Sequence, residues 1–306
     1  MARIYKTLEE LSKMENITEW VWRDLIIRDH VTILASRGGV GKSSLALWIA
    51  HELAKEEKKT LYIDAERTGC THGDRAKAWG LDHTDNIIFV CEDIGEDVGE
   101  SRIEPTGLGS PEELLAAAMD IKPDLIIIDS MTFSAANIKT MDRGEAIKYM
   151  DGLKIVSAKM KCGLLLLAHT NKKQDPAEQL TNDSIYGSGG ITDAARSVMT
   201  LDYVNAKDEP NKRILVQTKS NYNALAEPIQ FTLNLNGISD FAPFKGHKGK
   251  SGVRAQEFRS LVFLWWKEGK TLVEIQELLK QNSDASPNER SRAIKKVTND
   301  NNITWE

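Results

Sequence analysis

The segment from Val31 to Ser44 constrains the fold of this chain more than any other. It consists of an apolar stretch, a turn with three glycines, and a Lys-Ser-Ser sequence that opens a stretch with apolar residues at helical spacing. In such a turn the glycines let backbone N–H groups converge on an anion, the lysine adds charge for outer phosphates, and the next hydroxyl can bind Mg²⁺. The predicted nucleotide-binding residues are Ser36, Arg37, Gly38, Gly39, Val40, Gly41, Lys42, Ser43 and Ser44.

One position departs from the G-x-x-x-x-G-K-[ST] pattern, because Ser36 stands where the first glycine is expected. A small side chain still fits at that position. The alternative is a tight turn with a purely structural role. The preceding strand and the following helix, with Leu45, Ile49 and Leu53 on one face, favour nucleotide binding.

Three polar residues at predicted strand ends complete a candidate catalytic site. Asp129 follows four apolar residues and would hold Mg²⁺ together with Ser43. Glu66 lies just past the strand that ends at Asp64, so it is the predicted general base, and Asp64 is interpreted as structural. His169 follows a further apolar run, at the edge where open α/β sheets bind ligands, and is the predicted γ-phosphate sensor. A structural histidine is the alternative.

Composition sets the class of protein more broadly. The chain has 306 residues, enough for one large α/β domain and a small second one, and a formal net charge of −5, which alone gives no support for nucleic-acid binding. Its three cysteines form no C-x-x-C pair, so neither a disulfide framework nor a zinc site is favoured. The apolar runs are too short to span a bilayer, and the first residues lack the apolar core of a signal peptide. We therefore expect a soluble cytoplasmic protein with no membrane partner.

Strands and helices are expected to alternate along most of the chain. The later predicted strands lie at 60–64, 87–90, 124–129, 163–168, 198–203, 213–218 and 229–233, and helices at 42–56, 111–120 and 142–160. Several of the early strands are apolar throughout, as parallel strands covered on both faces are. The pattern predicts a doubly wound, mostly parallel sheet with an antiparallel extension.

A second domain is expected after a linker. Residues 237–252 have the composition of a flexible connection, so the predicted division is a first domain at 1–240, a linker at 241–252 and a small domain at 253–306. The small domain would contain a helix at 255–267, a second helix capped by Thr271 with Glu274, a third, basic helix near 286–297 and a short final strand near residue 303. This arrangement predicts a helix-turn-helix or minimal winged helix, with a protein-docking bundle as the alternative.

The motifs, taken in order, resemble those of the RecA-like ATPases, which include RecA, the ring helicases of the DnaB type and KaiC. The matching parts are the phosphate-binding loop, Asp-Ala-Glu at 64–66, Ile-Ile-Ile-Asp-Ser at 126–130, the polar strand end at 168–171 and the segment from Tyr186 to Arg196. Within that superfamily the chain is most similar to the RepA-type hexameric replicative helicases of plasmids and phages. Those helicases share the serine at the first loop position and the histidine on the sensor strand.

The resemblance implies a six-membered ring of identical subunits with ATP bound between neighbours, and a basic finger from the adjacent subunit. Lys219 stands at the finger position, although Asn221 occupies a place where arginine is frequent, so an ordinary strand-end lysine is the alternative. The resemblance also implies a central channel for single-stranded DNA. The predicted DNA-binding cations are Lys139, Arg143, Lys172 and Lys173.

The sequence thus predicts an ATP-hydrolysing, Mg²⁺-dependent motor on single-stranded DNA, a replicative helicase of plasmid or phage type whose C-terminal domain contacts DNA or a replication partner. A recombination or annealing ATPase shares the same residues and stays open. A partition ATPase of the ParA type is weaker, because its signature lysine is Arg37 here.

Overall fold

The computed structural model describes residues 5–13, 18–66, 69–90, 110–135, 138–171, 180–244, 261–281 and 287–300. The chain divides into two compact units. One comprises Met1–Lys172 with Asn182–Phe244, and the other comprises Lys173–Thr181 with Lys245–Glu306. The first unit contains the sheet and the predicted nucleotide site.

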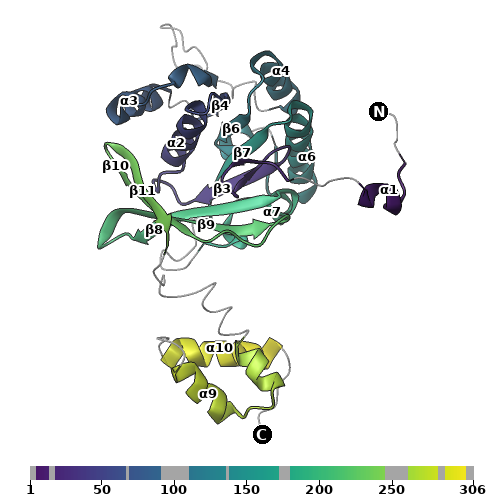
Figure 1. The fold of residues 1–306 in the computed structure, drawn as a ribbon, viewed down its shortest axis with the longest axis vertical. Helices are drawn as coiled ribbons and strands as arrows, with labels where there is room; N and C mark the ends of the chain where they lie inside the picture. Colours follow the sequence, from purple (N-terminus) through teal and green to yellow (C-terminus); the bar gives the residue numbers. More distant parts are fainter. Residues whose placement is uncertain are drawn as a thin grey trace. The chain divides into compact units, whose positions relative to one another are not determined.

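A nine-stranded sheet forms the centre of the first unit (Figure 1), in the order β11-β10-β9-β8-β3-β7-β6-β4-β5. The strands from β8 to β5 in that order pair in parallel, whereas β8 to β11 are joined by antiparallel pairs. The doubly wound sheet with an antiparallel extension is therefore confirmed. The strands are β3 (Val31–Ser36), β4 (Thr60–Asp64), β5 (Ile87–Val90), β6 (Leu125–Asp129), β7 (Gly163–His169), β8 (Ser197–Asn205), β9 (Glu209–Ser220), β10 (Ile229–Asn234) and β11 (Gly237–Pro243).

Helices cover both faces of this sheet (Figure 1), and the alternation of side chains along β6 shows why. Leu125 and Ile127 join the apolar cluster that includes α2, whereas Ile126 and Ile128 join the cluster that includes α4 and α6. Because a strand turns successive side chains to opposite faces, an entirely apolar strand needs a cover on each side. The helices of the first unit are α1 (Leu8–Ser12), α2 (Lys42–Ala54), α3 (Gly69–Trp79), α4 (Pro111–Ile121), α5 (Met131–Ser134), α6 (Arg143–Met160) and α7 (Gly189–Ala194), with 3-10 turns η1 (Thr84–Asn86) and η3 (Asn182–Ser184).

Local sequence fixes where these helices begin. Ser110 precedes α4, accepts a hydrogen bond from the Glu113 amide and is followed by a proline at the first helical position. Asp142 caps α6 in the same way through the Glu145 amide. A separate two-stranded ladder, β1 (Trp20–Trp22) with β2 (Ile26–Ile27), precedes the sheet and was not predicted from the sequence.

Strand β11 corrects the predicted linker. Residues 237–243 pair with β10 in an antiparallel hairpin, so the sheet extends to Pro243 and the predicted domain boundary at 240 falls inside a strand. The hairpin loop is Leu235-Asn236, and Gly237 follows it with φ of 118°, a conformation that favours glycine. An Asn-Gly pair between apolar runs is a hairpin signal that outweighs the loop-like composition of the segment.

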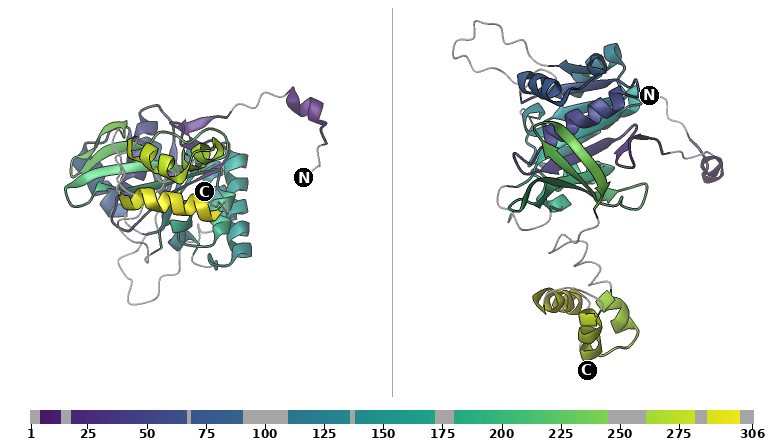
Figure 2. Two further views of the ribbon diagram at one scale, coloured as in Figure 1. Left: turned by 90° about the horizontal axis from the view of Figure 1, so that it is seen from below. Right: turned by 60° about the vertical axis from the view of Figure 1, so that its left-hand side comes forward.

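The second unit contains α9 (Leu272–Gln281), α10 (Pro287–Asp300) and helical residues 261–267, drawn in yellow and yellow-green in Figure 2. Its apolar cluster is Val262, Ile275, Leu279, Ala293, Ile294 and Val297. The predicted cap of α9 is confirmed, because Thr271 and Glu274 hydrogen-bond to each other's backbone amides. The linker residues 245–252 and the final predicted strand lie outside the described residues, and the helix-turn-helix assignment stays a prediction.

Candidate nucleotide-binding site

Four adjacent strands bring the predicted site residues to one edge of the sheet. In the order β3-β7-β6-β4, Ser36 is in register with His169, and Asp129 is in register with Asp64. All four of these strands are parallel, so their carboxyl ends lie along the same edge, which is where open α/β sheets bind ligands. The register places the phosphate-binding loop, the sensor strand and the metal-binding strand beside one another.

The loop between β3 and α2 has the backbone of an anion cradle. Gly39 and Gly41 have φ of 75° and 112°, values that favour glycine, and α2 begins directly at Lys42. A Cβ atom on Gly38 or Gly39 would meet no atom within 4 Å, so the concave side of the loop is open. A Cβ atom on Gly41 would lie 2.5 Å from the side chain of Leu233, so that glycine is required by packing against β10 as well.

Lys42 is a buried cation, 6% exposed, that contacts neutral groups. Its Nζ lies 3.2 Å from Ser36 Oγ and 3.4 Å from His169 Nδ1, and within the described residues no carboxylate forms an ion pair with it. Burial lowers the pKa of Lys42, and the charges of Asp129 and Glu66 oppose that shift. A buried ammonium group with neutral partners fits an incoming phosphate anion.

Glu66 lies within reach of two hydrogen-bond donors. Ser130 Oγ donates to Glu66 Oε1 at 2.6 Å, and His169 Nε2 lies 3.4 Å from the same oxygen. These contacts, with that of His169 the larger, lower the pKa of Glu66, so it is a carboxylate at neutral pH. Because His169 Nδ1 faces an ammonium donor and Nε2 faces a carboxylate, the tautomer that satisfies both sides carries its proton on Nε2.

Asp129 is 2% exposed and is oriented by a buried tyrosine. Tyr62 donates its hydroxyl hydrogen to Asp129 Oδ2 at 2.8 Å, and Ser43 hydrogen-bonds to the same carboxyl group. Burial raises the pKa of Asp129, while these two hydrogen bonds lower it. The predicted Mg²⁺ ligands Ser43 and Asp129 are therefore adjacent and offer hard oxygen donors. Two such ligands fit Mg²⁺, which takes few protein oxygens and completes its shell with water and phosphate. Consistently, the described residues contain no cluster of three or more His, Cys, Asp or Glu that would cage a metal alone.

Strands β8 and β9 supply three residues around the loop that the sequence analysis missed. Arg37 Nη2 pairs with Asp202 Oδ2 at 2.7 Å, and Arg213 Nε donates to the Val40 carbonyl at 2.7 Å. The Arg213 guanidinium also lies 4.0 Å from the centroid of the Tyr203 ring. The available signal was a charged residue, Arg213, at the start of an apolar run, and it did not specify a partner.

The predicted finger and channel residues lie elsewhere. Lys219 Nζ donates to the carbonyls of Thr192 and Asp193, at 2.8 and 3.1 Å, at the end of α7 in its own chain. Arg143 pairs with the Asp193 carboxylate at 2.8 Å, at the start of α6. The Lys139 amide donates to Glu145 at 2.7 Å. Lys172 and Lys173 lie outside the described residues. A role toward a neighbouring subunit or DNA stays a prediction for each of these cations.

Fold and loop together define a RecA-like P-loop ATPase, and comparison with known proteins supports that class. The AAA domain family matches residues 8–175, more than half of the chain, and the chain belongs to this family. The predicted resemblance to RecA-like ATPases is thereby confirmed.

Solved structures of the same fold include a KaiC-like protein from Pyrococcus horikoshii OT3, at 18% identity and a TM-score of 0.52 over 72% of this chain and 94% of that one. The solved ATPase domain of a helicase is 11% identical, with a TM-score of 0.57 over 70% of this chain and 86% of that one.

Curated relatives include the DNA repair protein RadA of Mycolicibacterium smegmatis, which is 29% identical over 144 residues, 44% of this chain and 23% of RadA. RadA of Aquifex aeolicus is 26% identical over 106 residues, 35% of this chain and 20% of RadA. The matched region thus spans about a quarter or less of these relatives. Within the described residues, no helix combines the length and apolar character needed to cross a membrane.

Proposed function

We propose that this protein is an ATP-hydrolysing motor on single-stranded DNA, a replicative helicase of plasmid or phage type that works as a ring of identical subunits. The observation that supports it best is the bridge made by His169. One ring nitrogen faces Lys42, the predicted phosphate contact, and the other faces Glu66, the predicted base, each at 3.4 Å. A single side chain therefore links the two groups that would act on either side of the γ-phosphate.

The proposed hydrolysis follows from these contacts. Lys42 and the loop amides hold the outer phosphates of ATP. Bound by Ser43 and Asp129, Mg²⁺ neutralises phosphate charge. The Glu66 carboxylate accepts a hydrogen bond from a water molecule and orients it for attack on the γ-phosphorus, while Ser130 and His169 hold the carboxylate in place. When the γ-phosphate leaves, Lys42 loses its anionic partner, and His169 transmits that change to the loop that begins at residue 170.

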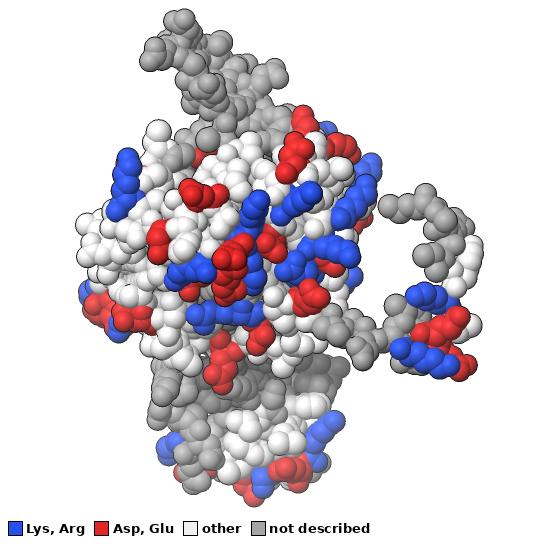
Figure 3. Space-filling view, turned by 45° about the horizontal axis from the view of Figure 1, so that its top comes forward, with Lys and Arg blue, Asp and Glu red and all other residues white. Residues whose placement is uncertain are grey.

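The DNA part of the proposal rests on the relatives and on the channel prediction. The curated relatives are named DNA repair proteins. On the face of the first unit shown in Figure 3, basic and acidic side chains are interspersed rather than gathered by sign. We therefore propose that DNA binds through the loops that carry Lys139, Arg143, Lys172 and Lys173, repeated around a ring, with no readout of bases.

A recombination or annealing ATPase is the second candidate, and the similarity to RadA favours it. The ParA-type alternative is weakened by one contact. Arg37, which stands where that family has its signature lysine, is paired with Asp202 of its own chain at 2.7 Å. The residues 253–306 are proposed to load the motor by contacting DNA or a replication partner.

Strand separation distinguishes the two candidates. The full-length chain is incubated with ATP, Mg²⁺ and a forked duplex, and native mass spectrometry gives the subunit number with and without ATP. We expect a six-subunit assembly that separates the fork. Annealing of complementary strands without separation would favour the recombination class, and a dimer without DNA-stimulated hydrolysis would contradict both.

A further inference from the structure

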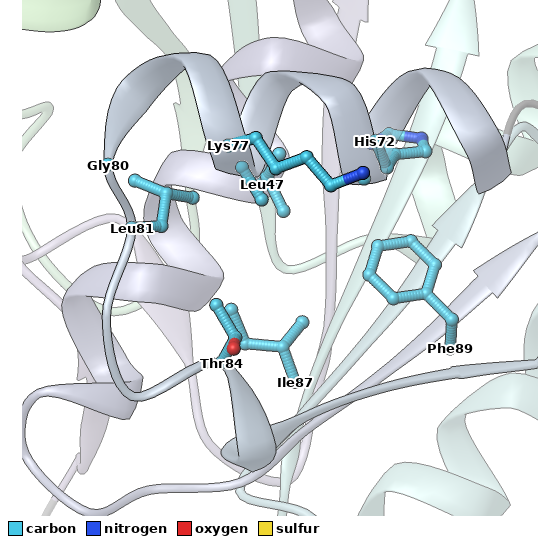
Figure 4. A pocket seen from close by; sticks show the side chains of 10 residues that line it. Leu47, His72, Lys77, Gly80, Leu81, Thr84, Ile87 and Phe89 are labelled. Atoms are coloured by element: carbon cyan, nitrogen blue, oxygen red, sulfur yellow. The ribbon is translucent and has the colours of Figure 1, made fainter.

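A cavity of about 780 Å³ lies at the edge of the sheet formed by β5, between α2 and α3 (Figure 4). Its walls are mostly apolar and include Leu47, Ala76, Leu81, Ile87 and Phe89. The volume is in the range of pockets that bind small molecules. None of the residues assigned to the nucleotide site lines it.

The cavity contains a buried polar group with no partner. His72, on α3, is 2% exposed, and neither of its ring nitrogens has a hydrogen bond. Burial, helped by the charge of Arg75, lowers the pKa of His72 to about 4, so the ring is neutral at pH 7 and carries one donor and one acceptor. Leaving both unsatisfied is costly unless something in the cavity bonds to them.

Lys77 supplies the one charged group among the lining residues. It is exposed, and it forms no ion pair or hydrogen bond within the described residues. Figure 4 shows its side chain extending along α3 in the direction of His72, with the Phe89 ring below. An apolar cavity with an aromatic wall, one unpartnered cation and one neutral imidazole is complementary to a molecule with an aromatic body and an anionic group.

From this arrangement we propose that the cavity is a binding site for a small aromatic anion, separate from the ATP site. The site does not depend on the proposed function. Its position links it to the catalytic edge, because the Tyr62 ring lies 5.0 Å from His72 and 4.6 Å from Phe89, and the Tyr62 hydroxyl orients Asp129. An occupant in contact with His72 and Phe89 thus acts on the side chain that positions a predicted Mg²⁺ ligand.

The test uses two fluorescent probes with the same rings and different charge, anilinonaphthalene sulfonate and the neutral N-phenylnaphthylamine, titrated against the full-length protein. We expect one saturable site per chain for the sulfonate. Lys77→Gln should weaken sulfonate binding about tenfold and leave the neutral probe unchanged. The matched control is Lys148→Gln, an exposed lysine on α6, which should leave both affinities unchanged.

Two further variants locate the probe. Ala76→Phe fills the cavity and should abolish binding of both probes while the protein keeps its thermal midpoint. Lys42→Ala should leave sulfonate binding unchanged even where ATP binding is lost, which separates this site from the proposed function. Sulfonate binding that is lost in Lys42→Ala, that is equal in Lys77→Gln and wild type, or that shows no saturable site would overturn the proposal.

Discussion

Replacing Arg213 with methionine should loosen the phosphate-binding loop without touching any residue of the loop itself. Arg213 is 6% exposed, and it donates to the carbonyl of Val40 within the loop and to that of Pro210 on its own strand, at 2.7 and 2.6 Å. Methionine keeps much of the volume but leaves both carbonyls without these donors. A hydrogen bond from a charged donor contributes about 1.5–3 kcal/mol, and the stacking on Tyr203 about 0.5–2 kcal/mol.

Because burying the guanidinium itself carries a cost that methionine avoids, the net loss should be about 2–3 kcal/mol in the free energy of unfolding. The assays are urea unfolding followed by tryptophan fluorescence and titration with a fluorescent ATP analogue. We expect a lower urea midpoint and an ATP dissociation constant raised about tenfold, since about 1.4 kcal/mol corresponds to a factor of ten. The control is Lys212→Met on the same strand, whose partner Glu209 is at the surface. Equal behaviour of the two variants would refute the role assigned to Arg213.

Three further predictions follow from the same contacts. Glu66→Gln should bind ATP with nearly wild-type affinity and lose turnover at least a hundredfold, measured by phosphate release, and wild-type hydrolysis would place the base elsewhere. The pKa of His72 is about 4 in the folded chain and 6.5 ordinarily, so the unfolded chain takes up the proton first as pH falls, and stability should drop by up to about 3 kcal/mol between pH 6.5 and 4. In urea titrations across that range His72→Phe should lose this part of the pH dependence and His83→Gln should keep it; identical slopes in all three proteins would contradict it. A chain that ends at Phe244, whose amide still bonds to the Pro228 carbonyl, should fold and hydrolyse ATP while its affinity for DNA or a partner falls, and loss of folding in circular dichroism would show that the second unit is an integral part of the first.

The sequence predicts the catalytic edge well because each of its residues follows a strong local pattern. Asp129 and His169 end apolar runs, and the runs become adjacent parallel strands whose ends coincide. Lys42 opens a helix directly after a glycine turn, which a single local motif encodes. Here local patterning and the three-dimensional arrangement agree, so neighbourhood in space follows from strand order alone.

The contacts made by β8 and β9 are a different case. Arg213 is far from Val40 in the sequence, and nothing local at either position specifies the pairing. The same holds for His72, which lies in a helix that was not predicted, and for Tyr62, whose hydroxyl reaches Asp129 across two strands. These contacts depend on packing between distant elements, which periodicity does not record. The β11 error had a local cause, since glycines and lysines after Pro243 masked the hairpin signal before it.

The central claim is that the edge formed by β3, β7, β6 and β4 hydrolyses ATP in response to single-stranded DNA. Steady-state phosphate release by the full-length chain, with Mg²⁺ and with or without single-stranded DNA, tests it directly when the Lys42→Ala variant is measured in parallel. We predict hydrolysis that DNA stimulates in the wild type and that is lost in the variant under both conditions. Hydrolysis that is absent from the wild type, indifferent to DNA or retained by Lys42→Ala would contradict the account.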